Sequence, residues 1–285
     1  SDLAAPYNWH SEISVENTLA SGLRLTVAYR FVRGLHQFRG RNLNAPLDIT
    51  SGTPRSCTVE QDATTCVRPL PGSGDIVQLE STGKSNDHQF RLAFQQRLSF
   101  LNIRGNYTAR SSYSDTSGPF RLPADNYDFR LEWGPEDEAH SIDTSVNLRL
   151  PWNIDANTQF NWSSGEPYSH ETGTDDNQDS EDNDRPPGVS RNSLTGPSFF
   201  EMGLELSKSI ILIPEAEAGV LDPAAGGGDF GRRSGVRMTL VVQADNVLNR
   251  FNASRVSGVE SSPFFGLPTR ARDGRKVSLS LRFDF

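Results

Sequence analysis

Apolar and polar residues alternate strictly at the end of this chain. Between Lys276 and Phe285, every second residue is Val, Leu or Phe, and the residues between them are Lys, Ser, Arg or Asp. A period of two predicts a β-strand with one apolar and one polar face. A strand of about ten residues is long enough for a tilted crossing of a lipid bilayer. We therefore predict a membrane-spanning strand over 274–285.

The same alternation recurs along the whole chain. Each repeat has apolar residues at every second position and charged or amide residues between them, and no segment has a clear helical period. Many alternating strands of similar length are typical of a β-barrel wall. The predicted strands are 10–17, 22–32, 87–97, 100–110, 141–150, 153–163, 198–208, 235–245 and 274–285.

The connections between these strands differ in length in a regular way. The turns at 17–22, 97–101 and 150–153 are short, whereas 33–74, 111–140, 164–198 and 246–275 are long. Outer-membrane barrels have short periplasmic turns and long external loops. Short and long connections then lie on opposite sides of the membrane, provided that 75–82 and 127–133 do not cross it. We predict that these two segments are strand extensions or external hairpin arms. Only the long, glycine-rich connection 209–234 does not fit, because it would be periplasmic.

These patterns predict an all-β fold, an antiparallel transmembrane β-barrel of the outer-membrane type. One barrel region covers residues 1–285 and supplies about nine to eleven strands. Bacterial single-chain barrels have an even number of strands, and an open edge in hydrocarbon would cost several kcal/mol per unpaired group. We therefore expect an incomplete wall that is closed by a missing part of the protein or by another chain.

Composition agrees with a membrane barrel and excludes other classes. Only 35% of the residues are hydrophobic, which is little for a soluble core but enough for the outer band of a barrel. No stretch approaches the roughly 18 apolar residues of a transmembrane helix. The net charge of -8, with no basic stripe, argues against nucleic acid as a partner.

The chain has two cysteines, Cys57 and Cys66, in a segment rich in Pro, Gly, Ser and Thr. In an oxidising compartment the pair would close a small surface loop. Two free thiols are the alternative, and metal binding is disfavoured because no Cys-x-x-Cys motif or nearby histidine is present. We predict a disulfide between Cys57 and Cys66.

An acidic run from Gly173 to Asn192 contains Asn-Asp-Arg-Pro at 183–186 and is followed by Gly196-Pro197. This stretch resembles the late external loop of TonB-dependent outer-membrane receptors, most closely the Oar-like group. The segments 33–46, 245–252 and 266–285 also resemble that group. The resemblance implies the carboxy-terminal part of a 22-strand barrel, whose amino-terminal plug carries the box that contacts TonB.

The resemblance also implies a function and partners. The chain would help to form a receptor or transporter in the outer membrane of a Gram-negative bacterium, for substrate uptake or surface binding. Neither plug nor TonB box is visible in the sequence, so TonB would act only through the missing part. Besides lipid, the barrel-assembly machinery is an expected partner, because it reads terminal apolar residues such as Leu281, Phe283 and Phe285.

The acidic run also contains a candidate calcium site. Asp175, Asn177 and Asp179 have the alternate spacing of calcium ligands. However, Ser180 stands where an EF-hand loop needs Gly, and Pro186 stands where it needs Glu. The alternatives are a solvated loop or a loop ordered by Arg185 and Arg191 pairing with its acids. No other cofactor is expected.

No enzymatic activity is predicted. The five histidines are dispersed, without metal-ligand spacing on one strand. Ser, Asp and His occur, but no nucleophile elbow or phosphate-binding glycine loop is present. Two alternatives to a receptor remain: a structural barrel subunit that scaffolds a larger complex, and a soluble extracellular β-sandwich adhesin.

An arginine on the apolar face tests the barrel against the sandwich. We expect Leu281→Arg or Leu240→Arg to cost about 2–4 kcal/mol at a lipid-facing position. In a sandwich core, either substitution would abolish folding, because an unpaired charge would be buried. The free energy of unfolding in detergent or lipid measures the effect, and a mild effect at both sites would contradict both folds.

Overall fold

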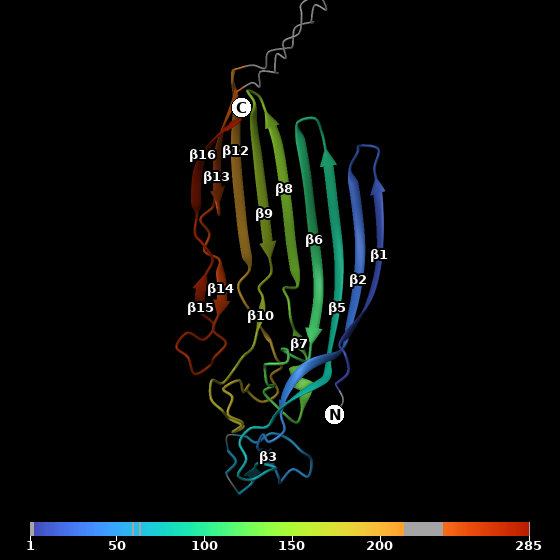
Figure 1. The fold of residues 1–285 in the computed structure, drawn as a ribbon, viewed down its shortest axis with the longest axis vertical. Coiled ribbons are helices and arrows are strands. Elements are labelled where there is room, and N and C mark those ends of the chain that lie inside the picture. Colours follow the sequence, from blue (N-terminus) through green and yellow to red (C-terminus); the bar gives the residue numbers. More distant parts are fainter. Residues whose placement is uncertain (1–2, 59, 63, 214–235, 285) are drawn as a thin grey trace, which may run out of the picture.

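The structure is a computed structural model that describes residues 3–58, 60–62, 64–213 and 236–284. Nine long strands form one antiparallel sheet in the order β1-β2-β5-β6-β8-β9-β12-β13-β16 (Figure 1). The predicted all-β fold and each of the nine predicted strand positions are confirmed. The strands are β1 (Tyr7–Thr18), β2 (Arg24–Asn42), β5 (Val77–Arg97), β6 (Leu101–Ser114), β8 (His140–Leu150), β9 (Ile154–Ser163), β12 (Phe199–Ile213), β13 (Val236–Asp245) and β16 (Lys276–Asp284).

Strand register places the apolar residues on one face of the sheet. Val15 pairs with Val27, which pairs with Leu92. This face is exposed: Ile13 is 68% exposed and Leu279 is 69% exposed. So large an apolar surface is suited to lipid rather than water. One row across the face consists of Val15, Val27, Leu92, Tyr107, Ile142, Trp162 and Phe200.

The opposite face of the sheet is polar. Arg24 pairs with Glu16 at 3.5 Å, and Arg104 Nε donates to Ser145 Oγ at 2.8 Å. Exposed ion pairs contribute at most about 1 kcal/mol each, so their main effect is to make this face wettable. One row across this face consists of Glu16, Thr26, Ala93, Asn106, Asp143, Asn161 and Glu201.

The sheet is open at both edges. In the described part of the chain, β1 and β16 each pair with a neighbour along one edge only. Because antiparallel strands alternate in direction and their number is odd, β1 and β16 run in the same direction. Direct pairing of β1 with β16 would therefore be parallel. An antiparallel closure requires an odd number of additional strands.

The two ends of the sheet differ, as the connection lengths predict. Tight turns join β1 to β2, β5 to β6 and β8 to β9 at the end near the carboxy terminus (Figure 1). In the last of these turns, three residues separate the partners Leu150 and Ile154, and two of them, Trp152 and Asn153, have left-handed φ values of 64° and 56°. The long connections gather at the other end, which we call the loop end. Of the misfitting connection 209–234, β12 covers the residues up to Ile213, and 214–235 lie outside the described residues.

Short elements order the loop end. They are β3 (Leu47–Asp48), β4 (Cys66–Val67), β7 (Gly134–Pro135), β10 (Pro167–Tyr168), β11 (Leu194–Thr195), β14 (Ala253–Val256) and β15 (Pro268–Ala271). β7 pairs with the end of β6, and the others form the hairpins β3–β4, β10–β11 and β14–β15.

The two segments predicted to be strand extensions or external hairpin arms differ in the structure. The prediction for 75–82 is confirmed, because β5 begins at Val77 and, together with β2, extends beyond the end of β6. The prediction for 127–133 is wrong: this segment contains the 3₁₀ helix η1 (Phe129–Glu132), which begins where Asp128 Oδ1 accepts a hydrogen bond from Arg130 N at 3.0 Å. No helix within the described ranges is long and apolar enough to cross a membrane.

Candidate functional site

The loop end is held together by polar rather than apolar side chains. Among the described residues, the largest fully buried side chains are all Asn or Asp. We call Asn42, Asn44, Asn126, Asn177 and Asp179 the polar loop core. A buried polar group must be hydrogen-bonded, or its burial costs several kcal/mol. The arrangement of the loops therefore depends on these bonds.

The polar loop core connects three segments that are far apart in sequence. The Asn42 backbone N–H, at the end of β2, donates to Asn126 Oδ1 at 2.8 Å. Asn126 Nδ2 then donates to Asp179 Oδ2 at 2.7 Å. Asn177 Nδ2 donates to the Ala124 carbonyl at 2.7 Å. The end of β2, the connection before η1 and the acidic run are therefore one hydrogen-bonded unit.

The cysteine-containing loop joins the same unit. Asn44 Nδ2 donates to the Gly74 carbonyl at 2.8 Å, and its Oδ1 accepts from Leu70 N at 2.8 Å. Within this loop the predicted disulfide is confirmed: Cys57 and Cys66 are bonded, with their Cα atoms 5.7 Å apart. The disulfide closes the loop that Asn44 anchors.

Each of the three calcium candidates accepts a hydrogen bond from a backbone N–H group of its own loop. Asp175 accepts from the N–H groups of Asp179 and Ser180 at 2.9 Å each, and Asn177 Oδ1 accepts from Asp179 N at 2.9 Å. Within the described residues, no group of three or more His, Cys, Asp or Glu side chains is arranged to hold a metal ion. The alternate spacing thus serves turn hydrogen bonds here, and calcium binding stays a prediction.

The two arginines of the acidic run differ from the expected arrangement. Arg185 pairs with Glu132 at 2.5 Å, and Arg191 pairs with Glu136. Both acids belong to the segment around η1 and not to the acidic run. The arginines therefore fasten this run to a neighbouring loop. Both guanidinium groups are buried and lie within 4.0 Å of Glu132, so removal of the Glu132 carboxylate would leave Arg185 buried without its partner.

Two carboxyl groups of the acidic run are buried. Burial raises the pKa of Asp179 to about 6 and that of Asp184 to about 7, and nearby carboxylates add to both shifts. Backbone N–H donors oppose these shifts: Asp184 Oδ2 accepts from the N–H groups of Asp176 and Asn177 at 2.7 and 3.1 Å. The charge of the acidic run therefore changes near neutral pH.

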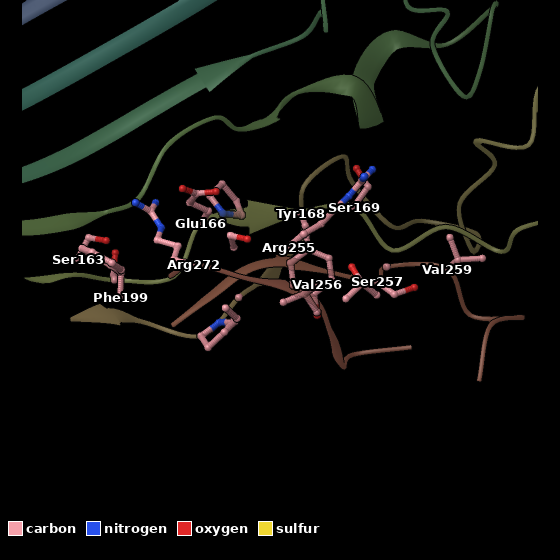
Figure 2. Close-up of a pocket in the computed structure, with 18 of the residues that line it drawn as sticks. Ser163, Glu166, Tyr168, Ser169, Phe199, Arg255, Val256, Ser257, Val259 and Arg272 are labelled. Carbon is pink, nitrogen blue, oxygen red and sulfur yellow. The ribbon is translucent and has the colours of Figure 1, made fainter. Parts of the chain in front are cut away.

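A pocket of about 480 Å³ lies between the hairpins β10–β11 and β14–β15 and the ends of β9 and β12 (Figure 2). Ser163 of β9 and Phe199 of β12 are register partners whose side chains lie on the polar face. The pocket therefore opens at the loop end, on the side that faces the interior of a closed barrel. No motif in the sequence marks its lining residues as a binding site.

Several charged groups line this pocket. The side chains of Glu166, Glu171 and Arg255 form no hydrogen bond or ion pair with the other described residues. Arg272 likewise lacks one, but its guanidinium lies over the Phe199 ring, 4.4 Å from the centroid. Burial raises the pKa of Glu171, against the opposing effect of nearby arginines. The pocket therefore offers a ligand donors and acceptors that bond to no other protein group.

Glycines allow the pocket walls to approach closely. A Cβ on Gly165 would overlap the carbonyl oxygen of Gly196, and a Cβ on Gly258 would overlap that of Ser169. At such positions only glycine lets two backbones come together. Glu171 N also donates to the Gly258 carbonyl at 2.8 Å. These glycines were the available sequence signal for the site, but their partners are too distant in sequence to identify.

The proposed assembly signal lies at an open edge. Leu281 and Phe283 belong to β16, on the apolar face, and are 57% and 48% exposed. Phe285 lies outside the described residues. Their recognition by the assembly machinery stays a prediction.

Comparison with known proteins identifies the architecture. Residues 1–198 match the family described as outer membrane beta barrel domain. The solved structure of the outer membrane transporter YddB from Escherichia coli is similar, with a TM-score of 0.56 and 14% identity. The match covers 98% of this chain but only 33% of YddB, so the chain spans about a third of that protein's length. No curated protein matches the sequence.

The family match and the fold decide between two of the predicted architectures. The outer-membrane barrel and its location in the outer membrane are confirmed. The sandwich alternative is wrong, because the nine long strands lie in one sheet rather than in two facing sheets.

We expect the acidic run, and the polar loop core that it joins, to be more stable near pH 5 than near pH 8. Asp179 and Asp184 retain protons in the folded loops at pH values where unfolded carboxyls, with pKa values of about 4, have lost them. This stabilisation is fully present below about pH 4 and is lost as the pH rises through about 6 to 7. Amide hydrogen exchange over 115–192 measures it. The double variant Asp179→Asn, Asp184→Asn should remove the dependence, and faster exchange at pH 5 after correction for intrinsic rates would contradict the prediction.

Gly258→Ala should loosen the pocket wall, because the new methyl group overlaps the Ser169 carbonyl oxygen. We expect limited proteolysis within 164–198 and 246–275 to become several-fold faster while the barrel wall stays resistant. Gly74→Ala is the matched control, since a Cβ there would meet no atom within 4 Å. Equal cleavage of both variants would show that close backbone approach does not hold the wall.

Proposed function

This chain belongs to the outer membrane β-barrel domain family, and we propose that it forms the carboxy-terminal part of the barrel of a TonB-dependent receptor of the Oar-like group. In this role the nine strands wall one side of a lumen. The loop end faces the outside and takes part in substrate uptake or surface binding. TonB acts through a plug that belongs to another part of the protein.

The open, two-faced wall is the observation that carries this proposal. Its apolar face suits lipid and its polar face suits a water-filled or plugged interior. The outer edges of β1 and β16 would leave backbone N–H and C=O groups unpaired in hydrocarbon, at several kcal/mol each. A larger barrel, in which an odd number of further strands closes the wall, removes this cost.

The loop end supports a receptor function. The disulfide, the polar loop core and the buried arginines order segments that a barrel could have left as short turns. Ordered loops on a rigid scaffold are where binding functions are usually located. The similarity to YddB, a transporter, agrees with a large barrel but concerns the fold alone.

A second candidate function is favoured by the same open edges. A structural subunit would be closed by another chain rather than by a further part of its own polypeptide. In both cases the expected partners are outer-membrane lipid and the assembly machinery that reads Leu281, Phe283 and Phe285. We propose no catalytic activity and no required cofactor for either function.

The mass of the native polypeptide in the outer-membrane fraction separates the two functions. For the receptor, we expect a denatured mass about two to three times the 31.5 kDa of this chain, because a plug and the remaining wall must be added. The purified protein should also be retained by the immobilised periplasmic domain of TonB. A mass of 31.5 kDa together with a co-purifying barrel protein would overturn the receptor proposal and support the subunit.

A further inference from the structure

We propose that the pocket between the hairpins β10–β11 and β14–β15 binds a neutral, polyhydroxylated ligand of the carbohydrate class. The inference rests on the proposed function in one respect, namely that the loop end faces the outside, where such a ligand would arrive. The charges, the hydroxyl groups and the shape of the pocket support it.

The charges of the lining balance. Arg255 and Arg272 supply two positive charges, and Glu166 and Glu171 supply two negative charges. A simple anion would meet the two carboxylates, and a simple cation would meet the two guanidinium groups. A hydroxyl group both donates and accepts hydrogen bonds, so a ligand with several hydroxyls can satisfy all four groups. The lining therefore selects for hydrogen-bonding capacity rather than for net charge.

Most hydroxyl groups of the lining form no hydrogen bond with other described residues. Ser164 and Ser169 already bond to the protein, since Ser164 Oγ accepts from His140 N and Ser169 Oγ bonds with Asn192. The remaining hydroxyls of the lining have no hydrogen-bond partner among the described residues. They belong to Ser163, Tyr168, Ser254, Ser257 and Thr269. A dense set of unused donors and acceptors matches the surface of a sugar.

Arg272 lies against an aromatic ring. Its guanidinium carbon is 4.4 Å from the centroid of the Phe199 ring, at the end of the pocket that adjoins the wall, and Ser163 lies beside it (Figure 2). Contact with the ring restricts the guanidinium, and its N–H groups bond to no other described residue. These N–H groups are therefore available to donate to ligand oxygens.

The pocket is formed before the ligand arrives. Gly196 N donates to the Glu166 carbonyl at 2.9 Å, and Glu260 N donates to the Glu171 carbonyl at 2.7 Å. These backbone bonds fix the main chain at both glutamates and leave the carboxylate oxygens unused. A volume of about 480 Å³ falls within the roughly 300–1,000 Å³ of small-molecule sites. Preorganisation reduces the cost of ordering the site on binding.

Calorimetric titration of the complete protein, purified from the outer membrane, tests the inference. The detergent must lack a sugar headgroup, and the probes are maltotriose, mannotriose and a galactose-based trisaccharide. Tri-alanine, a zwitterion of similar length, and citrate are the competing classes. We expect at least one trisaccharide to bind about tenfold or more tightly than tri-alanine and citrate.

Matched variants assign the binding to this pocket. Arg272→Gln should weaken trisaccharide binding about tenfold or more, the effect of losing a charged hydrogen bond. Arg250→Gln is the control: Arg250 lies 5.4 Å from the Phe200 ring centroid but does not line the pocket. Glu171→Gln should weaken binding, whereas Glu260→Gln, which alters the neighbouring pair with His170, should not. Heat-modifiable migration on gels verifies that each variant is folded.

Three outcomes would overturn the inference: no trisaccharide binds, tri-alanine or citrate binds more tightly, or Arg272→Gln and Arg250→Gln behave alike. Binding is measured without TonB, so the result does not depend on energised uptake. A protein that has the mass of a plugged receptor and is retained by TonB, but binds no trisaccharide, would overturn this inference alone. A protein of 31.5 kDa that binds trisaccharide through Arg272 would overturn only the receptor proposal.

Discussion

The pairing of backbone groups in hydrocarbon is the constraint on which this structure depends. Water is absent there, so every N–H and C=O of a crossing strand must bond to a neighbouring strand. The residues that the structure describes meet this requirement through eight antiparallel pairings between nine long strands, and they leave the outer edges of β1 and β16 open. The odd strand number makes the two edges unsuited to antiparallel pairing with each other. Closure by other strands is therefore a physical requirement.

The loop end is held together by side-chain hydrogen bonds and ion pairs rather than by strand pairing. It has few buried apolar side chains, and buried Asn, Asp and Arg residues replace them as the groups that hold the loops together. Hydrogen bonds have strict geometry, so a polar core specifies one arrangement more sharply than an apolar core of similar size would. Its cost is that each member depends on its partners, as Asn126 does on Asn42 and Asp179. The nearby pocket differs from the polar loop core, because its charged side chains form no hydrogen bond or ion pair with other described residues.

Much of the wall could be predicted from the sequence, and little of the pocket. Alternation marks each strand independently, because the side-chain period of a strand is local. The prediction for 127–133 was wrong because alternation over only seven residues does not distinguish a strand from a segment that contains a 3₁₀ turn. The pocket has no local period. Its lining comes from 163–171, 196–199, 253–259 and 269–272, which only the pairing of β9 with β12 and the loop hairpins bring together.

The sequence by itself determined which residues form strands, which face of each strand is apolar and which connections are long, because each of these properties depends on neighbours a few residues away. It also determined the cysteine pair, since only two cysteines are present. The tertiary structure alone decided that Arg185 and Arg191 pair with Glu132 and Glu136 rather than with the acidic run. It also decided that Glu166, Glu171, Arg255 and Arg272 line one pocket and that Arg272 lies over Phe199. These contacts join residues far apart in the chain, and their geometry follows from strand register and loop packing, which no local pattern encodes.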